Sequence, residues 1–178
     1  MALKATIFKT TLQIADMDRN YYHDHSFTIA RHPSETDERM MVRLLAFAFN
    51  ATEQLKFTRG ISTEDEPDIW RKSLSDEVEL WIDLGQPDEK RIKKACARAR
   101  QVIIYCFNDR SAPIWWEQTR GKLKRFRNLS VFHLQGDSTR RLAAMVDRNM
   151  RLQYSIQDGE VWVSNDDESV EVEVTALM

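Results

Sequence analysis

Residues 78–107 read VELWIDLGQPDEKRIKKACARARQVIIYCF, and this stretch indicates a strand, a helix and a second strand in succession. Residues 78–84 predict a strand that ends at Gly85, and Pro87 suits the first turn of the helix that follows. Residues 102–107 form a continuous apolar run, which is typical of a strand buried on both faces. The order strand, helix, strand predicts a βαβ unit with parallel strands.

Strands are also predicted at both ends of the chain. Residues 1–30 alternate with a period of two and predict a hairpin. Residues 149–178 predict a meander, with a hairpin turn at the Asp-Gly pair 158–159. Residues 34–148 supply the α/β core between them. We therefore expect an α/β (α+β) fold in one domain, 1–178, whose mixed core sheet is flanked by a second sheet from the two terminal segments.

The composition is that of an ordinary soluble globular protein. The chain has 178 residues, of which 42% are hydrophobic and 30% charged, with a formal net charge of -2. No segment reaches the roughly 20 apolar residues that span a bilayer, and no signal peptide is recognisable, so we expect a cytoplasmic protein without a membrane partner. Two cysteines support neither a disulfide framework nor a zinc site. The near-neutral charge means that any polyanion site must come from local clustering.

The carboxylate of Asp83 is predicted to lie at the carboxyl end of a parallel strand, where α/β folds commonly have their functional groups. Asp83 lies one residue before the end of its predicted strand, and it shares a face with Trp81 and Glu79. The carboxyl ends of parallel strands commonly carry functional groups. The alternative is that Asp83 only hydrogen-bonds the start of the following helix, and spacing alone favours that alternative.

A second acid strengthens the functional interpretation. Pro67-Asp68, followed fifteen positions later by Asp83, resembles the signature of the PD-(D/E)XK nuclease superfamily. In that superfamily the two acids lie at the ends of adjacent core strands and bind Mg²⁺. The lysine of the motif is missing, because position 85 is glycine. Some members carry this lysine on the next helix, where Lys93 and Lys94 are the candidates.

The chain as a whole resembles the YaeQ family of bacterial proteins. The segments that carry this resemblance are Met1–Ile7, Arg31–Thr36, Phe57–Gly60, Pro87–Cys96 and Ile156–Gly159. They are spread over essentially the full length. The resemblance implies a variant of the restriction-endonuclease-like PD-(D/E)XK core.

This resemblance implies a site for Mg²⁺, or Mn²⁺, held by Asp68, Asp83 and a third acid. A glutamate from the first core helix often serves in the superfamily, which makes Glu38 the candidate. The alternative for Glu38 is a first-turn acid favoured by the helix dipole. Asp65 or Glu66 could replace Asp68, which we prefer because it follows a proline and precedes an apolar pair. Such an ion would polarise a phosphate and activate a water for phosphodiester hydrolysis.

The choice between the two lysines depends on the predicted helix. At about 100° per residue, Lys93 lies on the flank of the buried face and Lys94 nearly opposite it. A flanking lysine can reach the strand ends, whereas the pattern of related nuclease-like sequences favours Lys94. Both residues stay candidates for the catalytic role.

Two basic stretches could contact nucleic acid. The candidates are Arg91, Lys94 and Arg98 on the helix and Lys122, Lys124 and Arg125 in a later segment. Their alternative role is a solvated surface. The sequence lacks a Gly-rich phosphate loop, a dinucleotide fingerprint and a nucleophile elbow, so no small-molecule cofactor is implied. We expect a metal-dependent nuclease-like protein that acts on or binds nucleic acid. The alternative is a nuclease-fold module that binds nucleic acid or protein without catalysis, which the missing lysine favours.

Overall fold

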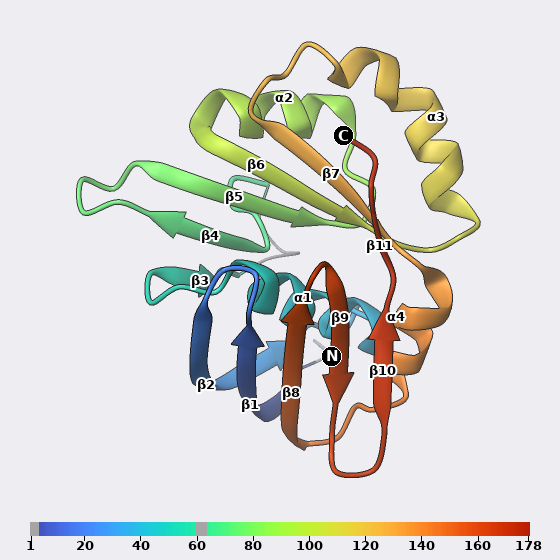
Figure 1. Cartoon of the computed structure of the whole chain (residues 1–178). Helices are drawn as coiled ribbons and strands as arrows, with labels where there is room; N and C mark the ends of the chain where they lie inside the picture. The colour runs from blue at the N-terminus through green and yellow to red at the C-terminus, as the bar shows by residue number, and fades with distance from the viewer. Residues whose placement is uncertain (1–3, 60–63) are drawn as a thin grey trace. The chain divides into compact units, whose positions relative to one another are not determined.

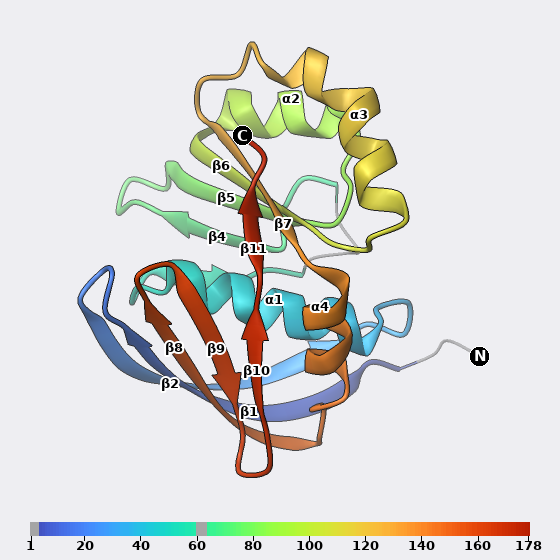
Figure 2. The same ribbon diagram turned by 45° about the vertical axis from the view of Figure 1, so that its right-hand side comes forward.

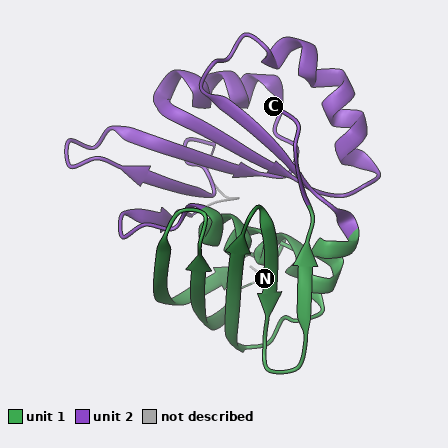
Figure 3. Cartoon of the chain, in the orientation of Figure 1, with its two compact units in different colours: residues 1–49, 137–173 green, residues 50–136, 174–178 purple. Residues whose placement is uncertain are grey.

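The computed structural model describes residues 4–59 and 64–178. Contacts between Cα atoms divide the chain into two units, which are coloured separately in Figure 3. Unit 1 combines residues 1–49 with 137–173, and unit 2 combines residues 50–136 with 174–178. Neither unit is one continuous stretch of sequence, and each is described by itself below.

Unit 1 contains a five-stranded sheet. Its elements are β1 (Thr6–Asp16), β2 (Tyr21–Arg31), α1 (Asp37–Asn50), α4 (Gly136–Ala143), β8 (Asn149–Gln157), β9 (Glu160–Ser164) and β10 (Ser169–Val172). The strand order is β10-β9-β8-β1-β2 (Figure 1). β1 pairs antiparallel with β2 and parallel with β8. The predicted joining of the N-terminal hairpin with the C-terminal strands in one second sheet is therefore confirmed for β8, β9 and β10. It is wrong for the last strand of the predicted meander, β11 (Val174–Ala176), which pairs with β7 (Leu129–Leu134) in the other sheet.

Helix α1 packs on one face of this sheet. Alternate side chains of β1 are buried, among them Leu12 and Ile14, as expected for a strand with one covered face. Phe47 of α1 contacts the rings of Phe27 and His25 on β2, at centroid distances of 4.8 and 5.1 Å. The expected α/β core, 34–148, includes this helix, whereas its contacts place it in unit 1.

Unit 2 contains a six-stranded mixed sheet. Its elements are β3 (Leu55–Phe57), β4 (Ile69–Lys72), β5 (Val78–Leu84), α2 (Glu89–Arg98), β6 (Ala99–Cys106), α3 (Ser111–Leu123), β7 (Leu129–Leu134) and β11 (Val174–Ala176). The strand order is β11-β7-β6-β5-β4-β3, in which β5, β6 and β7 run parallel. The predicted strand–helix–strand unit is confirmed as β5, α2 and β6.

Helices α2 and α3 cover the same face of the sheet in unit 2, as Figure 2 shows. Trp81 of β5 packs in one cluster with Ile92 of α2 and Trp115 of α3. The Asp88 side chain caps α2 by accepting the backbone N–H of Arg91 at 2.8 Å. This cap fixes where α2 begins and so places Arg91 in its first turn.

Two further features bear on the expectations from composition. Among the described residues, no helix is long and apolar enough to cross a membrane. Cys96 and Cys106 are free thiols, and burial raises the pKa of each to about 11. Each thiol is therefore protonated at neutral pH, as expected for a small apolar side chain in a core.

Candidate functional site

Asp68 and Asp83 lie on neighbouring strands of unit 2. β4 and β5 are antiparallel, with Ile69 opposite Ile82, and one further step of this register places Asp68 opposite Asp83. The Asp68 N–H donates to the carbonyl of Ile82 at 3.1 Å, and its Oδ2 accepts the N–H of Leu84 at 3.0 Å. The two acids are only 4% and 2% exposed. The fold thus brings the two predicted carboxylates together and buries both.

A cation from α2 already lies at this acid pair. Arg91 donates from Nε to Oδ2 of Asp83 at 2.9 Å and from Nη2 to Oδ1 at 3.0 Å. The same guanidinium donates to the carbonyls of Glu64 and Glu66, at 3.2 and 2.9 Å. This two-point contact is the strong geometry for an arginine and a carboxylate. Arg91 therefore connects β5, α2 and the segment before β4.

Burial and neighbouring charges act together on the acid pair. The Asp83 carboxylate interacts electrostatically with Asp68 and with Arg91, and Arg91 interacts with both acids. Burial raises the pKa of Asp83 more than the hydrogen bonds and charge of Arg91 lower it, and the nearby charge of Asp68 adds to the rise. A second positive charge at this position would lower the energy of both carboxylates.

The missing lysine of the nuclease motif has a backbone explanation. Gly85 follows β5 with a φ of 89°, which side chains other than glycine rarely adopt. Its N–H donates to the carbonyl of Tyr105 at 2.9 Å, so the turn is tied to β6. A lysine at position 85 would strain this turn. If a lysine acts at the acid pair, it must come from another element.

Glu38, the predicted third ligand, lies on α1 in unit 1. Its Oε1 accepts a hydrogen bond from the Thr139 hydroxyl at 3.2 Å. Among residues 4–59 and 64–178, the structure shows no cluster of three or more His, Cys, Asp or Glu side chains able to hold a metal ion. The convergent acids of unit 2 are thus a pair.

The acids that were alternatives to Asp68 lie elsewhere on the surface. Asp65 is exposed, and its Oδ1 accepts a hydrogen bond from Nζ of Lys94 at 2.6 Å. Glu66 is half-buried, and its Oε2 accepts the backbone N–H of Arg59 at 3.4 Å. The contacts described for Asp68 make it the acid that belongs with Asp83.

Three cations of α2 contact the same short acidic segment, Glu64–Glu66. Arg91 holds two of its carbonyls, Lys94 pairs with the Asp65 carboxylate, and Arg98 donates to the Asp65 carbonyl at 2.6 Å. The spacing of i, i+3 and i+7 places these side chains on one face of the helix. Lys93 is also exposed and takes no part in this set of contacts.

The second basic stretch is likewise paired within the chain. Lys122 and Arg125 approach the carboxylate of Glu89 in the first turn of α2, at 3.6 and 3.0 Å. Lys124 is exposed. Of the six cations predicted to contact nucleic acid, five therefore contact acids or carbonyls of their own chain.

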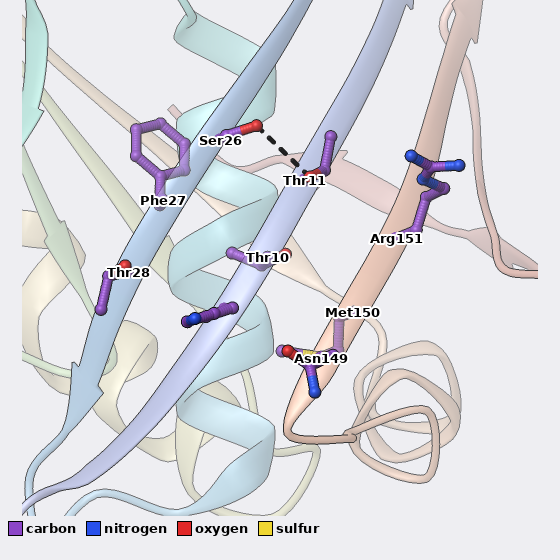
Figure 4. A pocket seen from close by; sticks show the side chains of 9 residues that line it. Thr10, Thr11, Ser26, Phe27, Thr28, Asn149, Met150 and Arg151 are labelled. Carbon is purple, nitrogen blue, oxygen red and sulfur yellow. Dashed lines mark hydrogen bonds between the residues drawn. The ribbon is translucent and has the colours of Figure 1, made fainter.

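Unit 1 carries a separate hollow of about 450 Å³ on its sheet. Its lining comes from β1, β2 and β8 and includes Thr11, Ser26 and Arg151 (Figure 4). The hydroxyls of Thr11 and Ser26 lie 3.3 Å apart across β1 and β2. The lining is mostly of hydroxyl and amide side chains, which fits a solvated sheet face better than a catalytic centre.

Comparisons of sequence and of structure relate the whole chain to known proteins. A sequence model of the family described as YaeQ protein matches residues 1–174. The protein "Uncharacterized protein YaeQ" of Escherichia coli K12 is 51% identical over 176 residues, which cover 99% of this chain and 97% of the relative. The crystal structure of YaeQ protein from Xanthomonas axonopodis pv. citri has a TM-score of 0.95 and 47% identity, with 98% of each chain covered. The YaeQ protein of Pseudomonas syringae has a TM-score of 0.94 and 37% identity, with 98% of this chain and 96% of that chain covered. The chain described here belongs to the YaeQ protein family.

Proposed function

We propose that the chain is a nuclease-like phosphodiesterase that depends on a divalent metal ion and acts on nucleic acid. The observation that carries this proposal is the burial of Asp68 and Asp83 on adjacent strands with Arg91 as their cation. Buried carboxylates are costly unless a cation accompanies them, so two of them on adjacent strands support a functional role for this position. The resemblance to the PD-(D/E)XK pattern supports metal-dependent phosphodiester hydrolysis as that role.

The acid pair suits Mg²⁺ or Mn²⁺ by donor type and by charge. Mg²⁺ keeps several waters and is commonly held by one or two carboxylates together with substrate phosphates. Asp68 and Asp83 would hold the ion, and the guanidinium of Arg91 already occupies a position that attracts positive charge. When bound, the metal would polarise a phosphoryl oxygen and lower the pKa of a water. Because two carboxylates are enough to hold such an ion, the proposal does not require Glu38 as a third ligand.

Of the two candidate lysines, the contacts favour Lys94. It shares a helix face with Arg91, which reaches Asp83, whereas Lys93 takes no part in those contacts. Its ammonium would orient a water or contact a phosphate of the substrate. Arg98 and Arg125 would hold the nucleic-acid backbone by exchanging their present partners for phosphates.

A second function is favoured by the same arginine. Both oxygens of Asp83 are already bound by Arg91, and Gly85 excludes the lysine of the motif. In this alternative, Arg91 permanently replaces the metal, and the fold serves as a module that binds nucleic acid or protein without cutting it. The acid pair would then stabilise the fold only.

Metal titration combined with a cleavage assay separates the two. Calorimetry with Mg²⁺ and Mn²⁺ should show millimolar or tighter binding to the wild type and none to Asp83→Asn. The wild type should cut single- or double-stranded DNA or RNA only with the metal. Asp76→Asn is the matched control, because Asp76 is an exposed acid paired with Lys72 in the β4–β5 turn. Absence of both metal binding and cleavage in the wild type would reject the phosphodiesterase, and binding of nucleic acid unaffected by a chelator would favour the module.

A further inference from the structure

The basic face of α2 is covered by an acidic segment of its own chain. Arg91, Lys94 and Arg98 each bind an oxygen of Glu64–Glu66, and together they make four contacts of 2.6 to 3.2 Å with it. Three of the four acceptors are backbone carbonyls, and the fourth is the Asp65 carboxylate. The segment thus presents a row of oxygens to a row of cations.

This arrangement has the chemistry of a cation row that binds a polyanion. Arginine and lysine side chains on one helix face commonly contact successive phosphates of a strand. A phosphate carries a full negative charge, whereas a peptide carbonyl carries none, so a cation is attracted more strongly to the phosphate. Three of the four acceptors in the segment are therefore weaker partners for these cations than phosphates would be.

The three cations differ in how firmly they are held. Arg91 is bound to the buried Asp83 and is 27% exposed in its side chain. The side chains of Lys94 and Asp65 are 49% and 80% exposed, and such exposed ion pairs contribute little to stability. Arg98 donates to a carbonyl, and its guanidinium carbon lies 5.3 Å from the centre of the Trp81 ring. Lys94 and Arg98 are the two cations that a competing ligand can take.

We propose that Glu64–Glu66 is an internal competitor that occupies the nucleic-acid site of α2 and lowers its affinity for a polyanion. The proposal rests on the proposed function, because it assumes that α2 contacts a phosphate backbone. Binding of a strand replaces the oxygens of the segment at Lys94 and Arg98, while Arg91 stays with Asp83. The segment thereby selects for a ligand with several phosphates over a single small anion.

The test compares two single charge removals. Asp65→Asn removes the carboxylate that pairs with Lys94, and Asp76→Asn removes an exposed acid that pairs with Lys72 in the same unit. Asn tolerates the left-handed backbone of position 76, so the control is not strained. Binding of a fluorescent oligothymidylate and of inorganic polyphosphate is measured by anisotropy and competition, without metal and over a range of salt.

We expect Asp65→Asn to bind the oligonucleotide about fivefold more tightly than wild type at low salt, because Lys94 no longer has to leave a carboxylate before it contacts a phosphate. The salt slope should match that of the wild type, since the same cations contact phosphates in both complexes. Asp65→Lys should extend this trend, and Asp76→Asn should bind like the wild type. Equal affinity of wild type and Asp65→Asn, or an equal gain in Asp76→Asn, would overturn the competitor while leaving the proposed function intact.

Failure of the proposed function gives a different pattern. If no variant binds or cuts an oligonucleotide, nucleic acid is not the ligand, and polyphosphate decides the competitor alone. Tighter polyphosphate binding by Asp65→Asn than by wild type then supports the competitor for another polyanion. No polyphosphate binding by any variant overturns it.

Discussion

Arg91 donates hydrogen bonds to both carboxylate oxygens of Asp83, although the two residues come from different elements of unit 2 and lie eight positions apart. The contact ties the first turn of α2 to the end of β5. Asp83 is buried, and the guanidinium of Arg91 is the positive charge that acts on its carboxylate. For a metal ion to bind Asp83 as proposed, it would have to share the carboxylate with Arg91 or replace this contact.

Removing the guanidinium should destabilise the protein and open the pair to metal. Arg91→Met leaves the buried Asp83 without the guanidinium that binds both of its oxygens, and breaking a buried pair in this way costs about 3 kcal/mol. Urea unfolding measures the loss. Millimolar Mg²⁺ should raise the melting temperature of Arg91→Met more than that of the wild type, because ligand binding to the native state stabilises it. Arg100→Met is the control, since Arg100 pairs with Glu77 on the surface and its loss should cost less than about 1 kcal/mol. A melting temperature of Arg91→Met that ignores Mg²⁺ would speak for a purely structural acid pair.

The raised pKa of Asp83 gives a signed dependence of stability on pH. Its native pKa lies above the ordinary value of 3.8, so its favourable contribution is complete below that value and is lost as the pH rises through the native pKa. Asp83→Asn cannot titrate and lacks this loss. The unfolding free energy of wild type should therefore fall relative to Asp83→Asn between about pH 4 and neutrality. A relative rise of the wild type over this interval would mean that Arg91 outweighs burial.

Gly85 should tolerate no side chain, whereas a helical glycine should. Gly85→Ala and Gly85→Lys force an L side chain into a φ of 89°, which costs about 1 to 2 kcal/mol. Gly121 lies near the end of α3 with open space around it, so Gly121→Ala should stabilise the protein by about 0.5 kcal/mol. Thermal unfolding of the three variants measures these differences. Gly85→Lys completes the literal nuclease motif, and we expect it to lose stability without gaining activity.

The two candidate lysines of α2, Lys93 and Lys94, should respond differently to truncation. If Lys94 acts on a water at the acid pair, Lys94→Ala lowers turnover by orders of magnitude while affinity for nucleic acid is nearly kept. If it only contacts phosphate, Lys94→Ala weakens binding and lowers the salt slope by about 0.7 with turnover preserved. Lys93→Ala is the matched control and should change neither quantity. Loss of turnover in Lys93→Ala alone would assign the catalytic role to Lys93.

Local pattern was enough to predict the elements around the site. The change from alternating to helical to continuous apolar spacing predicts β5, α2 and β6, because each period reflects one mode of burial. The terminal hairpin and meander are predicted for the same reason, and their pairing in one sheet is confirmed. The position of Asp83 at the end of its strand follows directly from these assignments.

The partners of the acids could not be predicted in the same way. Charge on a helix face predicts a nucleic-acid contact for Arg91, which stays a prediction, and it gives no sign that the guanidinium binds Asp83. The available signal was its place in the first turn after the Asp88 cap, on the side of the helix nearest the strand end. The end of the predicted meander also divides between two sheets: β10 ends at Val172 in unit 1, and β11 begins at Val174 beside β7. Alternation does not reveal which sheet a strand joins.

The parallel pairing of β1 with β8 sets an order of events during synthesis. Gln13 and Gln153 are hydrogen-bonded across these strands although they lie 140 positions apart. The β1–β2 hairpin leaves the ribosome long before β8 has been synthesised. The edge of β1 that pairs with β8 therefore stays without its hydrogen-bonding partner during this time. Pairing over such a separation in sequence is intrinsically slow. A nascent chain halted before residue 149 should therefore be held by chaperones or aggregate, with the hairpin as the exposed segment.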